Sequence, residues 1–177
     1  NVKFVYENNM MKGISGTSLF QPDHPLTRAM FATVLYRMQG EPAVTGENKF
    51  SDVAAGKWYT NAIIWANQKG IVSGYSDGSY GINHNITREQ IAKMLYEYAR
   101  VRGYDITARK ELSFFTDEKE VSSWAVGYMQ WATAVEMITG KPNTDETYRM
   151  DPKGQATRAE CAAMLMRFEN RYDKEAQ

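Results

Sequence analysis

Residues 87–98 read TREQIAKMLYEY, a threonine and an arginine followed by apolar residues at helical spacing. Two more stretches have the same form: residues 27–38 read TRAMFATVLYRM and residues 157–168 read TRAECAAMLMRF. Counted from each threonine, apolar residues fall at the same four places, which in the second copy are Ile91, Ala92, Leu95 and Tyr98. This spacing predicts one buried helical face per copy, and the recurrence predicts a tandem array of three repeats.

Each repeat is predicted to be helix, loop, helix. In the second copy a stripe at helical spacing runs from Trp58 through Trp65 to a glycine suited to a helix end, Gly70. A turn-rich loop follows, and Thr87 with Gln90 then forms a capping box. The sequence therefore predicts an all-α fold of three repeats at residues 1–40, 49–102 and 114–172, packed together as one unit. Only three residues precede Phe4, so we expect the chain to begin inside its first repeat.

Composition excludes several classes of partner. The chain has 21 basic and 21 acidic residues among 177, which gives no reason to expect nucleic acid or an anionic membrane. No apolar run approaches membrane-spanning length. The single cysteine, Cys161, lies on the apolar face of a predicted helix and is interpreted as a core residue.

The arginine after each capping threonine is unusual. A helix N-terminus carries partial positive charge and free N–H donors, so acidic residues are the ordinary choice there. Arg28, Arg88 and Arg158 are therefore candidate anion receptors, since a guanidinium grips a carboxylate bidentately and the helix end adds its dipole. The alternative is that each arginine pairs with an acidic residue of a neighbouring repeat, such as Asp52 or Asp117, and joins the repeats.

Aromatic and polar residues suited to a sugar accompany these arginines. Aromatic rings offer a flat face to a pyranose, and carboxylates bind its hydroxyl groups. The tryptophans at helical spacing are, taken alone, more often core residues, and the loop residues are the better ligand candidates. Glycines there allow close backbone approach, although a helix-ending turn needs glycine equally. The candidates are Trp58, Tyr75, Trp124, Asp52, Asp77, Asp117, Gly74 and Gly140.

Together these residues resemble the S-layer homology repeat. The resemblance is carried in the second copy by Phe50-Ser51-Asp52-Val53, Trp58, the stretch from Ala66 to Gly78 and Ile86-Thr87-Arg88-Glu89-Gln90. The third copy adds Phe115-Thr116-Asp117, Trp124, Trp131-Ala132 and Ala156-Thr157-Arg158-Ala159-Glu160. With the first copy, the resemblance covers nearly the whole chain.

The resemblance implies a pseudo-threefold helical spindle whose grooves between repeats bind a secondary cell wall polysaccharide through a pyruvylated N-acetylmannosamine-type unit. It implies that Arg28, Arg88 and Arg158 are the main binding residues, and that the chain is a noncatalytic anchor at the surface of a Gram-positive cell. It implies no cofactor, nucleic acid or membrane insertion. The alternative is a structural module that self-associates within a surface layer.

Several features depart from the family pattern or bear on an enzymatic role. Met30 replaces the usual acidic or amide residue, and Lys141 stands where the second copy has Tyr75, as a second anion contact or a solvated residue. The second repeat is the most complete, so we expect the groove that uses Arg88 to be the functional one. A glycoside hydrolase, as an example of an enzyme, requires paired carboxylates in a cleft, whereas Glu89 and Glu160 are interpreted as helix-start residues. His24 and His84 are interpreted as loop residues, and no metal site is expected.

Overall fold

Each of the three threonines begins a long helix, as predicted. In the computed structural model, which describes residues 1–14, 17 and 19–172, these helices are α2 (Arg28–Met38), α4 (Arg88–Arg102) and α6 (Arg158–Tyr172). The threonine hydroxyl accepts a hydrogen bond from the third backbone N–H of its helix in every copy. The side chains of Gln90 and Glu160 each accept a hydrogen bond from the N–H of their own capping threonine. This confirms the capping box predicted at Thr87 and shows the same arrangement at Thr157.

A shorter helix precedes the loop of each repeat. These helices are α1 (Val2–Glu7), α3 (Thr60–Gln68) and α5 (Val126–Ala134). Gly70 follows the end of α3 with a φ of 73°, a left-handed conformation that suits the helix end predicted at this glycine. The segments 40–48 and 103–113 contain no helix, as expected of connectors between repeats.

The third repeat adds elements that an all-α fold does not contain. Residues Lys141–Pro142 (β1) and Tyr148–Arg149 (β2) form a two-stranded antiparallel sheet, with Lys141 opposite Arg149. Two short 3₁₀ helices, η1 (Glu118–Glu120) and η2 (Ser123–Ala125), come before α5. The fold is helix-rich, but the purely helical expectation is corrected at this hairpin, whose longer loop has room for strand pairing.

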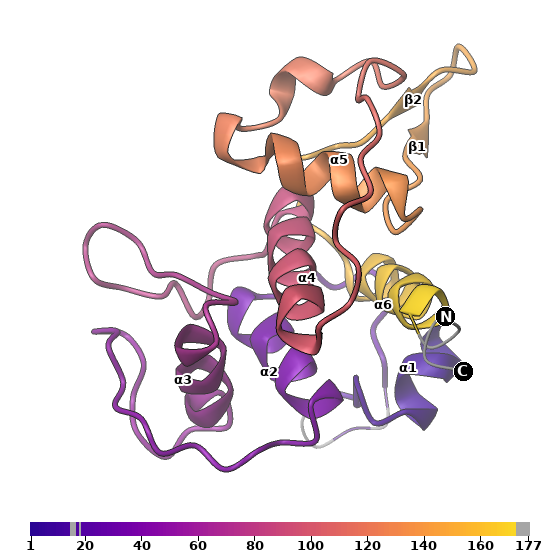
Figure 1. Cartoon of the computed structure of the whole chain (residues 1–177). Helices are drawn as coiled ribbons and strands as arrows, with labels where there is room; N and C mark the ends of the chain where they lie inside the picture. Colours follow the sequence, from indigo (N-terminus) through magenta and orange to yellow (C-terminus); the bar gives the residue numbers. More distant parts are fainter. Residues whose placement is uncertain (15–16, 18, 173–177) are drawn as a thin grey trace.

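The first helix of a repeat packs against the second helix of another repeat. Figure 1 shows α3 beside α2 and α5 beside α4, while α1 lies against α6 near the two ends of the chain. Aromatic contacts hold two of these pairs: the Trp65 ring lies 5.6 Å from Tyr36, and the Trp131 ring lies 5.3 Å from Tyr96. Each repeat therefore depends on a neighbour to cover its helices.

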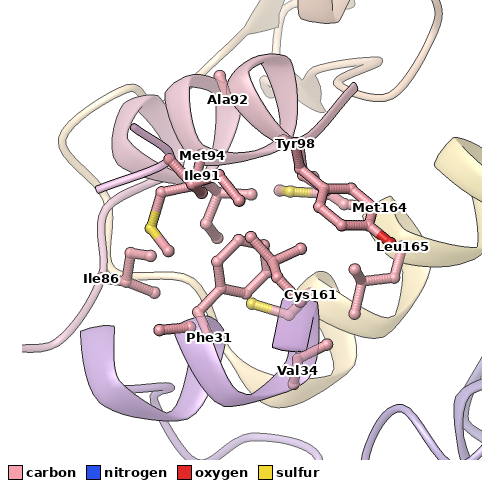
Figure 2. Packing of buried hydrophobic residues seen from close by; sticks show 14 of the residues in the cluster. Phe31, Val34, Ile86, Ile91, Ala92, Met94, Tyr98, Cys161, Met164 and Leu165 are labelled. Carbon is pink, nitrogen blue, oxygen red and sulfur yellow. The ribbon is translucent and has the colours of Figure 1, made fainter. Parts of the chain in front are cut away.

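The three long helices share the core. Figure 2 shows side chains of α2, α4 and α6 meeting, among them Phe31, Ile91 and Leu165, and all three side chains are fully buried. Cys161 lies in the same cluster with no exposed surface, which confirms its interpretation as a core residue. Burial raises the pKa of its thiol, so the neutral form is favoured.

Backbone hydrogen bonds join the residues just before the long helices into a closed ring. The Leu26 N–H donates to the Ala156 carbonyl, the Ala156 N–H to that of Ile86, and the Ile86 N–H to that of Leu26, over 2.8 to 3.0 Å. This ring fixes the starts of α2, α4 and α6 relative to one another. Within the described residues, none of the helices has the length and hydropathy required to cross a bilayer.

Candidate functional site

One cavity of about 410 Å³, named groove A here, is lined by residues from all three repeats. The first repeat supplies Arg28, and the third supplies Trp124. The second repeat supplies the loop after α3 and the first turns of α4. Its lining residues are Ile71, Val72, Ser73, Gly74, Tyr75, Glu89, Gln90, Lys93 and Met94.

Arg28 joins the first repeat to the second through backbone carbonyls. Its Nε donates to the Tyr80 carbonyl over 3.0 Å, and one terminal nitrogen donates to the Ser73 carbonyl over 3.1 Å. The guanidinium carbon lies 4.6 Å from the centroid of the Tyr80 ring and 5.0 Å from that of Tyr75. These contacts use two of the five guanidinium N–H groups and hold the charge beside the cavity.

The other two arginines make the same kind of contact. Arg88 Nε donates to the Met150 carbonyl, and Arg158 donates to the carbonyls of Phe20 and Lys12. The arginines therefore do join neighbouring repeats, and they do so mainly through carbonyl oxygens. Asp52 and Asp117 are not their partners, but Arg88 also pairs with an acidic residue of the third repeat, Glu160, at 3.9 Å, as the alternative expected. The predicted help from free N–H groups of the helix end is wrong for α4 and α6, because their first three backbone N–H groups all have partners.

Trp124 and Lys93 form the open side of groove A. The Trp124 side chain is 47% exposed, and the Lys93 ammonium lies 5.8 Å from its ring centroid and 3.3 Å from the Ser73 hydroxyl. The core interpretation is wrong for Trp124 and for Trp58, which is 60% exposed, because both precede their helices. It is confirmed for Trp65 and Trp131, which lie inside α3 and α5 and are buried.

A second cavity, groove B, has the same construction one repeat earlier. Its volume is about 420 Å³. Arg158 stands in the place of Arg28, and Trp58 in that of Trp124. The loop after α1 and the helix α2 complete the lining with Met11, Lys12, Gly13, Ile14, Leu26, Met30, Thr33, Val34 and Arg37. Groove B is therefore more apolar than groove A, because Ile14 and Met30 replace Tyr75 and Gln90.

The surroundings of Arg88 differ from those of Arg28. The Lys141 ammonium lies 2.7 Å from Asp151 and 2.8 Å from Glu160, and Glu160 also lies 3.9 Å from Arg88. Burial raises the pKa of both carboxyl groups, but the hydrogen bond and charge of Lys141 outweigh it and lower both values. Lys141 is thus neither a solvated residue nor a free cation. The two carboxylates of Asp151 and Glu160 balance the charges of Lys141 and Arg88, so this neighbourhood gives no support to the expectation that Arg88 marks the functional groove.

Asp52 and Asp117 hold loops in place. Asp52 accepts hydrogen bonds from the N–H groups of Tyr80, Gly81 and Ile82 over 2.6 to 3.1 Å. Burial raises the pKa of Asp52, yet these three bonds together lower it below the ordinary value. Asp117 accepts equivalent bonds from Met150 and Asp151. Both carboxylates thus accept hydrogen bonds from backbone N–H groups. The structure gives them a role in holding loops, whereas the sequence predicted that they bind sugar hydroxyl groups.

The loop residues divide between structure and cavity. A Cβ added at Gly74 would lie 2.6 Å from both the Phe50 ring and the Ser79 carbonyl, and one at Gly140 would lie 2.8 Å from the Phe115 ring. Both glycines therefore permit close packing. Tyr75 is partly exposed beside His84, whose ring nitrogen lies 3.2 Å from its hydroxyl. Asp77 is exposed and bonds to Ser79 within its own turn.

Sequence reasoning misses one residue of groove A and one role of another. Lys93 occupies a polar position of α4 that has Thr33 and Ala163 as its counterparts, so only an alignment of the repeats singles it out. Glu89 is a helix-start residue, as interpreted, but it is also 3% exposed and bonds to Ser122 and Lys153. The available signal was its contrast with Ala29 and Ala159 in the other copies.

The chain offers little for metal binding where it is described. Among residues 1–14, 17 and 19–172, the structure places no three His, Cys, Asp or Glu side chains together as a cation site. His24 and His84 are exposed loop residues.

Comparisons with known proteins match the same segments. The model of the S-layer homology domain matches residues 49–92 and 114–162. The chain is 32% identical over 93% of its length to an amylopullulanase of Thermoanaerobacterium thermosulfurigenes, of which it spans 8%. It is 30% identical over 84% of its length to a surface-layer 125 kDa protein of Lysinibacillus sphaericus, of which it spans 12%. It is 29% identical over 89% of its length to a cellulosome-anchoring protein of Acetivibrio thermocellus, of which it spans 34%.

Proposed function

This chain belongs to the S-layer homology domain family, and on that premise we propose that it is a noncatalytic module that attaches a larger protein to the cell wall polysaccharide of a Gram-positive bacterium. Its place is the cell wall or cell surface, in keeping with the family and with its surface-layer and cellulosome-anchoring relatives. The chain spans 8%, 14% and 17% of the length of three relatives, an amylopullulanase, an exoglucanase and an endoglucanase, so it corresponds to a small part of each.

The observation that carries the proposal is the composition of groove A. Three repeats bring Arg28, Lys93 and Trp124 to one open cavity. The Lys93 ammonium lies over the exposed Trp124 ring, and the Arg28 guanidinium lies over the rings of Tyr75 and Tyr80. A sugar with a carboxylate fits this arrangement, because its C–H face packs on the indole and its charge meets the cations. We assign a pyruvylated N-acetylmannosamine-type unit to this role, since its ketal carries such a carboxylate.

The arrangement of the repeats supports a pseudo-threefold spindle. The short helices pack on the long helices in a cycle, α1 on α6, α3 on α2 and α5 on α4, so each repeat covers the repeat before it, as a threefold symmetry requires. The backbone ring at Leu26, Ile86 and Ala156 likewise passes once through each repeat. Repeat boundaries at residues 1–40, 49–102 and 114–172 follow from it. Grooves A and B then occupy two equivalent places, related by one step of the repeat.

The proposed roles of the site residues differ. Arg28 and Lys93 bind the carboxylate in groove A, Trp124 carries the sugar ring, and Tyr75 lines the loop side. Arg158 and Trp58 have the matching roles in groove B. Asp52 and Asp117 position the loops, and Gly74 and Gly140 give the loops the space they need. Asp77 contributes through the shape of its turn, and Arg88 is assigned chiefly to joining the second and third repeats.

Sedimentation of the chain with purified Gram-positive cell walls tests this function. Walls should bind the chain before extraction of their non-peptidoglycan polysaccharide and should lose that binding afterwards. The folded Trp124→Ala variant should bind intact walls more weakly than the wild type. Equal binding to extracted walls would contradict the proposal, and concentration-dependent assembly without polysaccharide would favour the self-association module instead.

A further inference from the structure

A third cavity adjoins groove B at Trp58. It has a volume of about 560 Å³ and shares three lining residues with groove B, namely Thr33, Arg37 and Trp58. The two cavities are therefore neighbours along the same wall of the molecule. The cavity is named the side pocket here, and its other wall is the connector between the first two repeats, including Pro42.

The walls of the side pocket are held by specific hydrogen bonds. The Tyr36 hydroxyl donates to the Pro42 carbonyl over 2.7 Å and fixes the connector against α2. The Thr60 hydroxyl donates to the Ala54 carbonyl and accepts from the Lys57 N–H, which fixes the turn that carries Trp58. The pocket is thus already shaped before a ligand binds, which lowers the entropic cost of binding.

The chemistry of the side pocket differs from that of groove B. It shares Arg37 with groove B and adds the polar side chains of Lys57 and Asn61, while groove B is lined largely by methionine, isoleucine, leucine and valine. Arg37 pairs with Glu41 at 3.8 Å. Within the described residues the Lys57 and Asn61 side chains have no hydrogen-bond or ion-pair partner, so their donors and the Asn61 acceptor remain available. Such groups suit the hydroxyl groups of an uncharged sugar.

The equivalent place beside groove A has different residues. The residues that correspond to Arg37, Lys57 and Asn61 are Glu97, Ser123 and Gly127. Glu97 is already held, because it accepts a hydrogen bond from Arg100 over 2.6 Å and one from the Tyr128 hydroxyl over 3.3 Å. The same chain therefore contains a natural comparison between a groove with Arg37, Lys57 and Asn61 beside it and one with other side chains in their places.

We propose that the side pocket is a second subsite, which binds the uncharged sugar that follows the terminal anionic sugar of the wall polysaccharide, with Trp58 between the two units. Groove B with its side pocket thereby binds two consecutive sugars of one polysaccharide molecule, and groove A binds one sugar. This inference rests on the proposed function, because the anionic unit must first occupy groove B.

Calorimetric titration with fragments of the wall polysaccharide tests the subsite. The Trp124→Ala variant isolates groove B, and the Trp58→Ala variant isolates groove A. In the first variant, a disaccharide that contains the anionic sugar should bind about tenfold more tightly than the anionic monosaccharide alone. In the second variant, the two ligands should bind alike.

Two substitutions in the Trp124→Ala background then locate the effect. Lys57→Ser introduces the residue found at the equivalent place of groove A, and Asn61→Ala removes the amide. Each should reduce the gain from the second sugar and leave the affinity for the monosaccharide unchanged. An equal gain in these variants, or no gain in the parent, would overturn the subsite while leaving the anchoring function intact. Failure of the monosaccharide to bind either groove would refute the function and the subsite together.

Discussion

Glu89 accepts two hydrogen bonds from Ser122, one from its backbone N–H over 3.0 Å and one from its hydroxyl over 2.9 Å. Lys153 adds an ion pair to the same carboxylate at 2.7 Å. Ser122 lies two residues before Trp124, so this buried carboxylate of the second repeat holds the turn that carries an aromatic residue of groove A. Ala29 and Ala159 occupy the equivalent places in the other repeats, so the first and third repeats lack this contact.

Replacement of Glu89 by alanine should loosen that turn. The free energy of unfolding should fall by about 1–3 kcal/mol, because the Ser122 donors lose a charged, buried acceptor. Urea denaturation measures this loss, and acrylamide quenching in a Trp58→Phe background reports the mobility of Trp124, since Trp65 and Trp131 are buried. Glu89→Gln keeps a hydrogen-bond acceptor, so its free energy of unfolding should lie between those of the wild type and Glu89→Ala. Unchanged stability and quenching in Glu89→Ala would show that the contact does not position Trp124.

Gly74→Ala should destabilise the fold by about 1–3 kcal/mol, the usual range for overpacking. The new Cβ would lie 2.6 Å from the backbone oxygen of Ser79 as well as from the Phe50 ring, so a side-chain shift alone gives no relief. Thermal unfolding measures the change.

Gly127→Ala is the matched control for this substitution. Gly127 lies within α5, and no heavy atom lies within 4 Å of an added Cβ. Alanine should therefore stabilise the chain by about 0.5–1 kcal/mol through helix propensity. A stabilising effect at Gly74 would contradict the close packing of its loop.

Asp52 should make stability depend on pH in the acidic range. Its pKa in the folded chain is below the ordinary value of 3.8, so the ionised form is the one that favours folding. This contribution is fully present above the ordinary value and is lost as the pH falls through the lowered pKa. Asp52→Asn should lower the free energy of unfolding by about 1–3 kcal/mol at pH 7. Chemical denaturation at several pH values checks this, and a variant whose stability falls as steeply with acid as the wild type's would contradict it.

The sequence predicted the long helices well because their starts and faces are local features. Thr87 and Gln90 form the capping box, and Ile91 and Leu95 recur at helical spacing, so both signals lie within a few residues. The packing partners were not predictable in the same way. The contact of Trp65 with Tyr36 joins residues of different repeats, and helical spacing does not encode which repeat a helix covers.

The candidate site was predicted only in part for related reasons. Trp58 was assigned to a helix by its spacing from Trp65, whereas α3 begins at Thr60, and helix boundaries are the least certain part of such a prediction. The three arginines look equivalent in sequence. Their difference arises from distant neighbours, since the Asp151 and Glu160 carboxylates neutralise the cations around Arg88, while Lys93 adds a second cation near Arg28.

Calorimetric titration with purified wall polysaccharide tests the central claim most directly when groove A is isolated, by comparing the Trp58→Ala chain with the same chain carrying Lys93→Gln. Lys93 is partly exposed on α4 and faces groove A, so its replacement should preserve the fold and weaken binding about fivefold, with a smaller effect at high salt. Lys69→Gln, which replaces an exposed lysine outside both grooves, is the control and should bind like its Trp58→Ala parent. Equal affinities for all three proteins would contradict the assignment of groove A as the site for the anionic sugar.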